Sequence, residues 1–314
     1  MSNSAIAASG LRKAYGDKVV LDGIDLDVRE GTVFSLLGPN GAGKTTTVHV
    51  LTTLVRADGG TARVAGHDIA AAAKAVRAAI GVTGQFAAVD ELLTGQENLQ
   101  LMADLRHLGA REGKRVIGGL LERFDLTESA QKLVSTYSGG MRRKLDLAMT
   151  LVGRPRIIFL DEPTTGLDPR SRRTMWEIVR GLVADGVTVF LTTQYLEEAD
   201  QLADRIAVLD KGRLVAQGTP GELKRQVPGS HVQLRFASAG ELDAAARLLA
   251  GAARDDENLT LRVAGDGGVR SLQALLGRLT EHSVNAEELS VHTPDLDDVF
   301  LALTGHHDTK ENAR

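Results

Sequence analysis

The fold is decided by the stretch Gly38-Pro39-Asn40-Gly41-Ala42-Gly43-Lys44-Thr45-Thr46, which contains the pattern G-x-x-x-x-G-K-[S/T] in full. An apolar run typical of a buried strand precedes it at 32–37, and residues 45–51 have the pattern of a helix start. The glycines let backbone N–H groups turn inward as an anion site, Lys44 adds a positive charge, and the Thr45 hydroxyl is a ligand for Mg²⁺. This phosphate loop (residues 38–46) therefore predicts a nucleoside triphosphate site.

Composition limits the classes of protein to consider. The chain has 314 residues, 43% of them hydrophobic and 25% charged, which suits about two globular domains with sizeable cores. Its net charge of −4 gives no basic footprint, so we expect no nucleic-acid partner. The sequence has no cysteine and its eight histidines are scattered, which argues against disulfides and against thiolate or histidine metal sites. No apolar run approaches about 18 residues, so a membrane role would need another chain to supply the span.

The order of patterns along the chain predicts two domains. Strand and helix patterns alternate from Val33 to about Leu214, which indicates an α/β domain with a mostly parallel sheet over 1–225. Strand patterns are missing between Gly95 and about Ser135, which we interpret as a helical subdomain over about 86–150. After a Pro-Gly linker, period-two and helical patterns resume in a small α+β domain over 226–305. Residues 306–314 have the composition of a disordered polar tail.

Two acids follow the apolar strand pattern at 157–160. A strand buried on both faces delivers the residues at its carboxyl end to the sheet edge where ligands bind. Asp161 is placed to orient Mg²⁺, and Glu162 to hold and deprotonate the attacking water. The alternative is that the acids only begin a helix, a reading that the nearby phosphate loop disfavours.

Further motifs carry a family resemblance. They are Gln85, the signature segment Tyr137-Ser138-Gly139-Gly140-Met141, and Thr165-Gly166-Leu167-Asp168. With the phosphate loop, they make residues 5–225 resemble an ATP-binding-cassette (ABC) ATPase of the P-loop NTPase class. The resemblance implies that Ser138, Gly139, Gly140 and Met141 bind the ATP held by the opposite subunit. It therefore implies a head-to-tail homodimer that closes on two ATP molecules.

The same resemblance assigns roles to single residues. Tyr15 would stack on adenine, although a tyrosine at a strand end is about as often simple packing. Gln85 would sense the γ-phosphate and join Thr45 and Asp161 as a ligand of Mg²⁺. Asp168 would couple the two ATP sites across the dimer.

The chain departs from the family pattern at three positions. Tyr137 and Met141 stand where Leu and Gln are usual, so side-chain contacts of the signature segment differ while its backbone donors remain. Gln194 stands where most members have a switch histidine. A glutamine amide can donate a hydrogen bond to the γ-phosphate but cannot carry a proton. We therefore expect Gln194 to position and sense the γ-phosphate. Slower turnover of ATP would be a further consequence of this substitution.

Over nearly its whole length the chain resembles the daunorubicin-resistance type of drug-export ATPase. The resemblance rests on Thr192-Thr-Gln-Tyr-Leu-Glu-Glu-Ala-Asp200 and on the ending at 294–305. It implies an ATPase peripheral to the cytoplasmic side of the cell membrane, paired with a separate multi-span permease that exports a hydrophobic drug. A lipid, polysaccharide or peptide cargo stays open, as does a soluble, non-transport ABC ATPase.

Two surface features have alternative interpretations. Leu296, Val299, Phe300 and Leu303 share one apolar helix face, which either docks on the small domain's own sheet or contacts a dimer partner or permease. The basic cluster at 142–144 predicts a solvated helix face, or a group that helps to attract phosphate.

Overall fold

The computed structural model describes residues 4–85, 87–226, 230–265, 268–292 and 294–304. The chain divides into two compact units, Met1–Pro220 and Gly221–Arg314. The sequence placed the boundary after residue 225 instead. The difference arises because helix α8 (Pro220–Gln226), which buries Leu223, clusters with the second unit. The expected Pro-Gly linker and polar tail lie outside the described residues.

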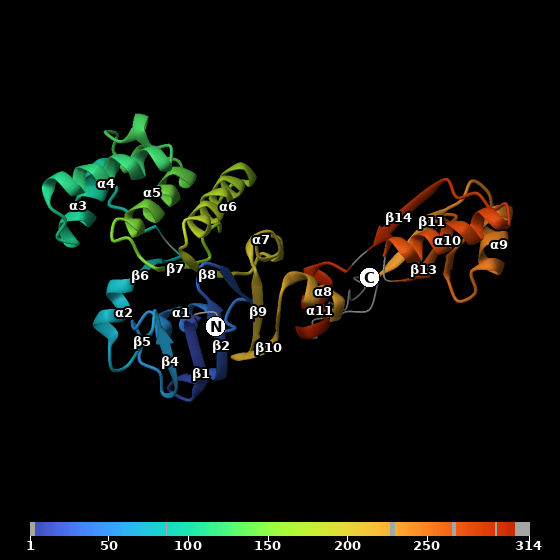
Figure 1. Ribbon diagram of the computed structural model, residues 1–314, viewed down its shortest axis with the longest axis horizontal. Coiled ribbons are helices and arrows are strands. Elements are labelled where there is room, and N and C mark those ends of the chain that lie inside the picture. The colour runs from blue at the N-terminus through green and yellow to red at the C-terminus, as the bar shows by residue number, and fades with distance from the viewer. Residues whose placement is uncertain (1–3, 86, 227–229, 266–267, 293, 305–314) are drawn as a thin grey trace, which may run out of the picture. The chain divides into compact units, whose positions relative to one another are not determined.

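The central sheet of the first unit has six strands. They are β3 (Val33–Leu37), β6 (Ile80–Thr83), β7 (Ile157–Asp161), β8 (Thr188–Thr193), β9 (Arg205–Asp210) and β10 (Arg213–Gly218). Their order is β10-β9-β3-β8-β7-β6, and all pairs are parallel except that of β10 with β9 at the edge (Figure 1). Strands β3, β7 and β8 are buried along their whole length, as in sheets covered on both faces. The predicted α/β class is confirmed.

A second sheet of the first unit is antiparallel, in the order β2-β1-β4-β5, and the sequence did not predict it. Its strands are β1 (Ser4–Tyr15), β2 (Lys18–Arg29), β4 (Gly59–Val64) and β5 (His67–Asp68). One continuous core joins this sheet to helix α1 (Lys44–Leu51) and to the phenylalanines of the central sheet. The rings of Phe34 and Phe159 lie 5.5 and 5.4 Å from that of Phe190. This core anchors the strand and helix that carry the phosphate loop.

Between β6 and β7 the chain is helical, as expected. The helices are α3 (Gly95–Leu105), α4 (Ala110–Arg123) and α5 (Gly139–Leu151), with short 3₁₀ turns η1 (Thr127–Ser129) and η2 (Val134–Thr136). These green helices gather on one side of the first unit in Figure 1. A reciprocal cap fixes the start of α3, since Thr94 accepts from the amide of Glu97 and Glu97 accepts from that of Thr94. A shared core packs these helices against β7, β8 and α6 (Pro169–Ala184). Two short helices, α2 (Ala73–Ala79) and α7 (Leu196–Leu202), complete the unit.

The second unit has a four-stranded antiparallel sheet in the order β12-β13-β11-β14. Its strands are β11 (His231–Arg235), β12 (Ala253–Asp255), β13 (Thr260–Ala264) and β14 (Glu288–His292), and its helices are α9 (Ala239–Leu248), α10 (Val269–Glu281) and α11 (Leu296–Thr304). Helices α9 and α10 pack on the sheet around Leu234, Leu242 and Leu279. The unit is α+β, as expected.

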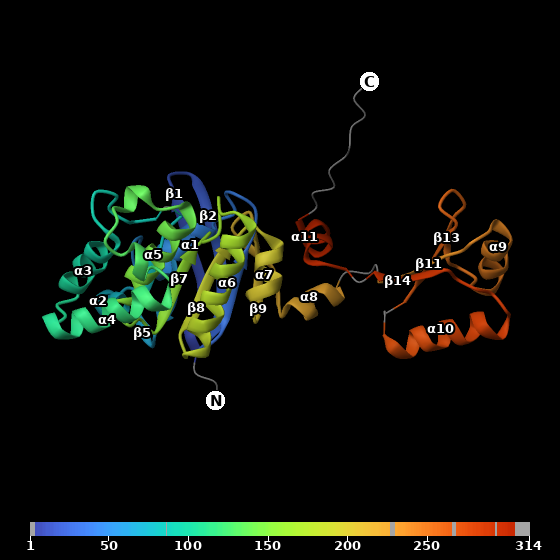
Figure 2. The same cartoon turned by 90° about the horizontal axis from the view of Figure 1, so that it is seen from above.

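Helix α11 does not dock on this small sheet, so that interpretation of its apolar face was wrong. Leu296 and Val299 are buried, yet among the described residues the core of the small sheet includes none from α11. Figures 1 and 2 place α11 beside α8, which buries Leu223. Periodicity alone predicted the buried face of α11 but could not identify the surface that covers it. Within the described ranges, no helix is both long and apolar enough to cross a bilayer.

Candidate active site

The phosphate loop runs from the carboxyl end of β3 into α1, and its glycines are required by geometry. Gly41 and Gly43 have φ of 81° and 112°, a region that favours glycine. A Cβ at Gly38 would lie 2.3 Å from the carbonyl oxygen of Leu209, so that position also excludes a side chain. Gly43 stands at the N-cap of helix α1, where a glycine offers no side chain to satisfy the first amides of the helix. The loop therefore presents N–H donors at a positive helix end.

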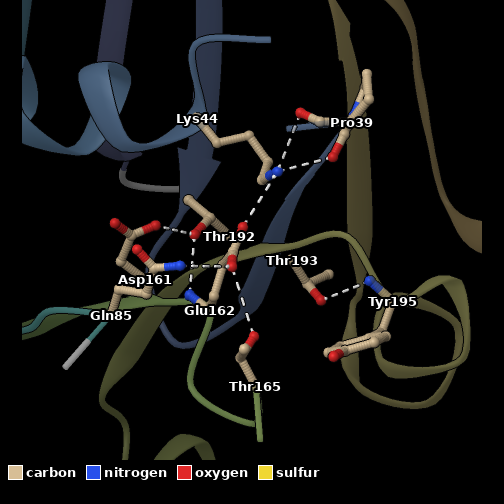
Figure 3. Close-up of polar contacts among 10 residues, drawn as sticks. Pro39, Lys44, Gln85, Asp161, Glu162, Thr165, Thr192, Thr193 and Tyr195 are labelled. Atoms are coloured by element: carbon tan, nitrogen blue, oxygen red, sulfur yellow. Dashed lines mark hydrogen bonds and ion pairs between the residues drawn. The ribbon is translucent and has the colours of Figure 1, made fainter. Parts of the chain in front are cut away.

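Lys44 lies with its ammonium group between the phosphate loop and the end of β7. It is 5% exposed and donates to the carbonyl oxygens of Gly38 and Pro39 at 2.8 and 3.2 Å. Its Nζ also lies 3.3 Å from Oε1 of Glu162 (Figure 3). Two carbonyl oxygens and one carboxylate oxygen thus surround the ammonium group. A phosphate oxygen bound in the loop would compete with these acceptors for the positive charge.

Glu162 lies at the centre of a polar cluster that it forms with Lys44, Gln85 and Thr165. Its Oε2 lies 3.4 Å from Nε2 of Gln85 and 3.5 Å from Oγ1 of Thr165. The backbone of Glu162 is left-handed, with φ of 49°, which turns the chain sharply at the end of β7. Gln85, Lys44 and Glu162 come from three separate segments and meet at the carboxyl edge of the sheet.

Thr192 supports both acids, and the sequence did not predict this role. It pairs with Asp161 in the register of β7 and β8 and is fully buried. Its hydroxyl donates to Oδ1 of Asp161 and accepts from the amide of Glu162 at 3.1 Å (Figure 3). One side chain thus fixes the orientation of two neighbouring acids. The available signal was a pair of polar residues, Thr192 and Thr193, directly after the apolar residues of β8.

The predicted metal ligands offer oxygen atoms, the donors that Mg²⁺ prefers. They are the exposed hydroxyl of Thr45 at the start of α1, the buried carboxylate of Asp161, and the amide oxygen of Gln85, whose nitrogen is turned toward Glu162. Across the described residues, no group of three or more His, Cys, Asp or Glu side chains could hold a metal. One hydroxyl, one carboxylate and one amide oxygen fit an ion that takes its other ligands from phosphate and water.

The signature segment lies at the start of α5, as predicted. Ser138 caps the helix, and its Oγ accepts from the amide of Met141 at 3.3 Å. Ser138, Gly140 and Met141 line a cleft of about 780 Å³ between α5 and α6. No residue of the phosphate loop lines this cleft, so the chain does not bring its own two nucleotide-binding motifs into one site.

Tyr137, one of the departures from the family pattern, is a packing residue. It is buried, and its hydroxyl donates to the carbonyl oxygen of Ser129 at 2.7 Å. Burial also raises the pKa of its phenol. A Cβ at Gly95 would lie 2.2 Å from the Tyr137 hydroxyl, so the ring fits because residue 95 is glycine. The second departure, Met141, is partly buried and packs against the same core.

Asp168 caps helix α6. Its carboxylate accepts from the amide of Ser171 at 2.9 Å and from the Ser171 hydroxyl at 2.6 Å, and these bonds lower its pKa. A Cβ at Gly140 would lie 2.7 Å from Oγ of Ser171, so the signature segment touches this cap directly. The predicted coupling role of Asp168 remains a prediction.

Tyr15 and Gln194 lie outside the polar cluster. Tyr15 ends β1 with 48% of its surface exposed, and Nζ of Lys13 lies 5.3 Å from its ring centroid. Gln194 follows β8 and is half-buried; within the described part of the chain it forms no hydrogen bond or ion pair. The next residue is held where the amide of Tyr195 donates to Oγ1 of Thr193 at 2.9 Å. The expected adenine stacking and γ-phosphate sensing remain predictions.

Replacing Gln194 by histidine is expected to raise kcat for ATP by about threefold or more, with little change in KM. An imidazole at the end of β8 can both donate a hydrogen bond and exchange a proton, whereas the amide forms hydrogen bonds but cannot exchange a proton. Steady-state phosphate release from the Gln194→His chain measures the effect. An unchanged kcat would show that this position does not limit turnover.

Comparison with known proteins decides the family. A family model described as "ABC transporter" matches residues 21–165. The chain is 51% identical to the daunorubicin resistance ATP-binding protein DrrA3 of Streptomyces coeruleorubidus, over 97% of each chain. This chain belongs to the ABC transporter ATPases.

Other relatives extend the comparison. The Nod factor export ATP-binding protein I of Ralstonia nicotianae is 40% identical over 97% of this chain and 95% of that protein. A solved structure described as an ATP-binding subunit of an ABC transporter superposes with a TM-score of 0.64 at 28% identity, covering 71% of this chain and 92% of that one. The predicted drug-resistance type of ABC ATPase and the P-loop fold are confirmed. As an ABC transporter ATPase, the chain binds ATP and couples its hydrolysis to transport.

Proposed function

We propose that this chain is the energy-supplying subunit of a drug exporter, located peripherally at the cytoplasmic face of the cell membrane. Two copies pair head to tail and close on two molecules of ATP with Mg²⁺, working with a separate multi-span permease. One observation carries the pairing: the cleft of the signature segment excludes the phosphate loop of the same chain. In a head-to-tail pair, the signature segment of one copy completes the site at the phosphate loop of the other, and no further motif is needed.

The geometry supports a role for each side chain in hydrolysis. The phosphates bind the amides of the phosphate loop and compete with Glu162 for Lys44, which frees a carboxylate oxygen of Glu162. Glu162 then orients water and accepts its proton, while Gln85 and Thr165 hold the carboxylate in place. Gln194 donates to the γ-phosphate. When bound at Thr45, Asp161 and Gln85, Mg²⁺ offsets phosphate charge.

The cargo we propose is a hydrophobic drug. The support is that the relative with 51% identity bears the name of a daunorubicin resistance protein. A lipid, polysaccharide or peptide remains the second candidate, since a relative with 40% identity is named for Nod factor export. The higher identity to the daunorubicin resistance protein favours a drug as the cargo.

Affinity capture followed by reconstitution tests the proposal. Tagged Glu162→Gln chain with ATP is applied to detergent-solubilised membranes of the host, and the Lys44→Ala chain serves as the matched control. We expect a multi-span membrane protein to co-purify only with the former, and vesicles containing both wild-type chains to move daunorubicin upon ATP addition. Recovery of ribosomes or DNA-repair proteins would contradict the exporter. Transport of a lipid-linked saccharide in place of daunorubicin would contradict the cargo.

A further inference from the structure

A buried arginine in the first turns of α5 binds two segments that form the active site. Arg143 is 7% exposed, contrary to the solvated helix face that the sequence predicted. Its Nη1 donates to the carbonyl oxygen of Gly84 at 2.7 Å, its Nε to that of Pro163 at 2.9 Å, and its Nη2 to that of Asp161 at 3.3 Å. One guanidinium therefore links the ends of β6 and β7 to α5.

Asp146, one turn further along α5, completes the arrangement. Its Oδ2 lies 3.3 Å from Nη1 of Arg143, and its Oδ1 accepts from the amide of Ala88 at 3.0 Å. It is 4% exposed; burial raises the pKa of its carboxyl, while the Ala88 amide and the Arg143 charge lower it. Gly84 and Ala88 stand on either side of Gln85. The ion pair thus holds both flanks of the residue predicted to sense the γ-phosphate.

The choice of partners separates this pair from an ordinary buried salt bridge. A buried ion pair contributes little net stability, because desolvation offsets the attraction between the charges. Here three of the donated hydrogen bonds of Arg143 go to carbonyls next to Gln85 and on either side of Glu162. The planar guanidinium spreads its donors over three nitrogen atoms and so reaches carbonyls in separate segments, whereas the three donors of a lysine ammonium radiate from a single nitrogen.

We propose that Arg143 and Asp146 form a clamp that positions Gln85 and Glu162 relative to the signature segment. Ser138 of the signature segment caps the start of helix α5, so a displacement of this helix start moves both active-site segments with it. The catalytic groups of one chain therefore respond to the nucleotide that its signature segment binds. This inference rests on the proposed head-to-tail pairing for its purpose, while the clamp itself lies within one chain.

Two readouts on the full chain test the clamp without any permease. Amide hydrogen exchange without nucleotide should show at least about tenfold faster exchange at Ala88 in Asp146→Ala, because the acceptor is removed. In Arg143→Lys we expect kcat for ATP to fall at least about tenfold with the Kd for ATP within about twofold. The chain that carries both Arg143→Ala and Asp146→Ala should lose no more kcat than whichever of the two single alanine variants has the lower kcat. Arg154→Ala, which removes an exposed ion pair with Glu112 just beyond α5, is the matched control.

Several results would overturn the clamp. Unchanged exchange at Ala88 would show that Asp146 does not hold this segment. Faster exchange at Ala88 with an unchanged kcat would show that holding this segment does not position the groups that act in hydrolysis. A fall in kcat matched by weaker ATP binding, or one also seen in Arg154→Ala, would indicate a general structural role. If the alanine variant unfolds, Asp146→Leu repeats the exchange test, because leucine has nearly the same shape as aspartate and no acceptor for the Ala88 amide. None of these results depends on a membrane partner, so failure of the export proposal is a separate outcome.

Discussion

Steady-state ATP hydrolysis is expected to fall by about 10²- to 10⁴-fold when Glu162 is replaced by glutamine. The amide has nearly the same size as the carboxyl and can keep a contact with Gln85 and Thr165. It cannot accept a proton from water, and it removes the negative charge beside Lys44. ATP binding should therefore persist or strengthen while turnover collapses. Phosphate release measures the rate, and size-exclusion chromatography with ATP should reveal a trapped dimer.

The control for this prediction is Glu122→Gln, which removes a carboxylate from the exposed face of α4. Its hydrolysis rate and elution volume should match those of the wild-type chain. Normal turnover in Glu162→Gln would show that another group accepts the proton. Loss of turnover without a dimer would instead contradict the proposed closure on two ATP molecules.

Replacing Lys44 by alanine is expected to weaken ATP binding by at least about 100-fold, which corresponds to about 3 kcal/mol. The substitution removes the cation that faces Gly38, Pro39 and Glu162. It also leaves the Glu162 carboxylate without its positive partner, so phosphate would meet an uncompensated negative charge. Titration with a fluorescent ATP analogue measures the Kd.

Two further chains separate charge from packing at this position. Lys44→Met keeps most of the buried aliphatic stem, so its ATP affinity should be as low as that of Lys44→Ala while its thermal unfolding resembles the wild type. Lys74→Ala removes an exposed lysine on α2 and should leave the Kd unchanged. Wild-type affinity in Lys44→Met would refute the role of the charge.

The convergence of Lys44, Gln85 and Glu162 could be predicted because parallel strands end at the same edge of a sheet. Local motifs identified each residue, and topology brought them together. The support from Thr192 could not be predicted, since it depends on which residue of β8 pairs with Asp161. Strand register is set by pairing between segments that are distant in sequence.

The basic cluster at the start of α5 shows a different limit. Three successive basic residues suggested one solvated face, yet successive helical positions point about 100° apart. Arg143 points inward because carbonyl groups at the ends of β6 and β7 accept its donors. The available local signal was Asp146, an acid three residues later on the same helix side. Burial of α11 away from the small sheet likewise depends on long-range packing that periodicity does not encode.

The left-handed backbone at Glu162 has a cost in stability. A non-glycine residue in that conformation costs about 1 kcal/mol relative to glycine. Glycine at 162 would remove this cost, but it would also leave the buried ammonium group of Lys44 without its carboxylate partner. With the role proposed for Glu162, the strained backbone is kept together with the carboxylate that hydrolysis needs.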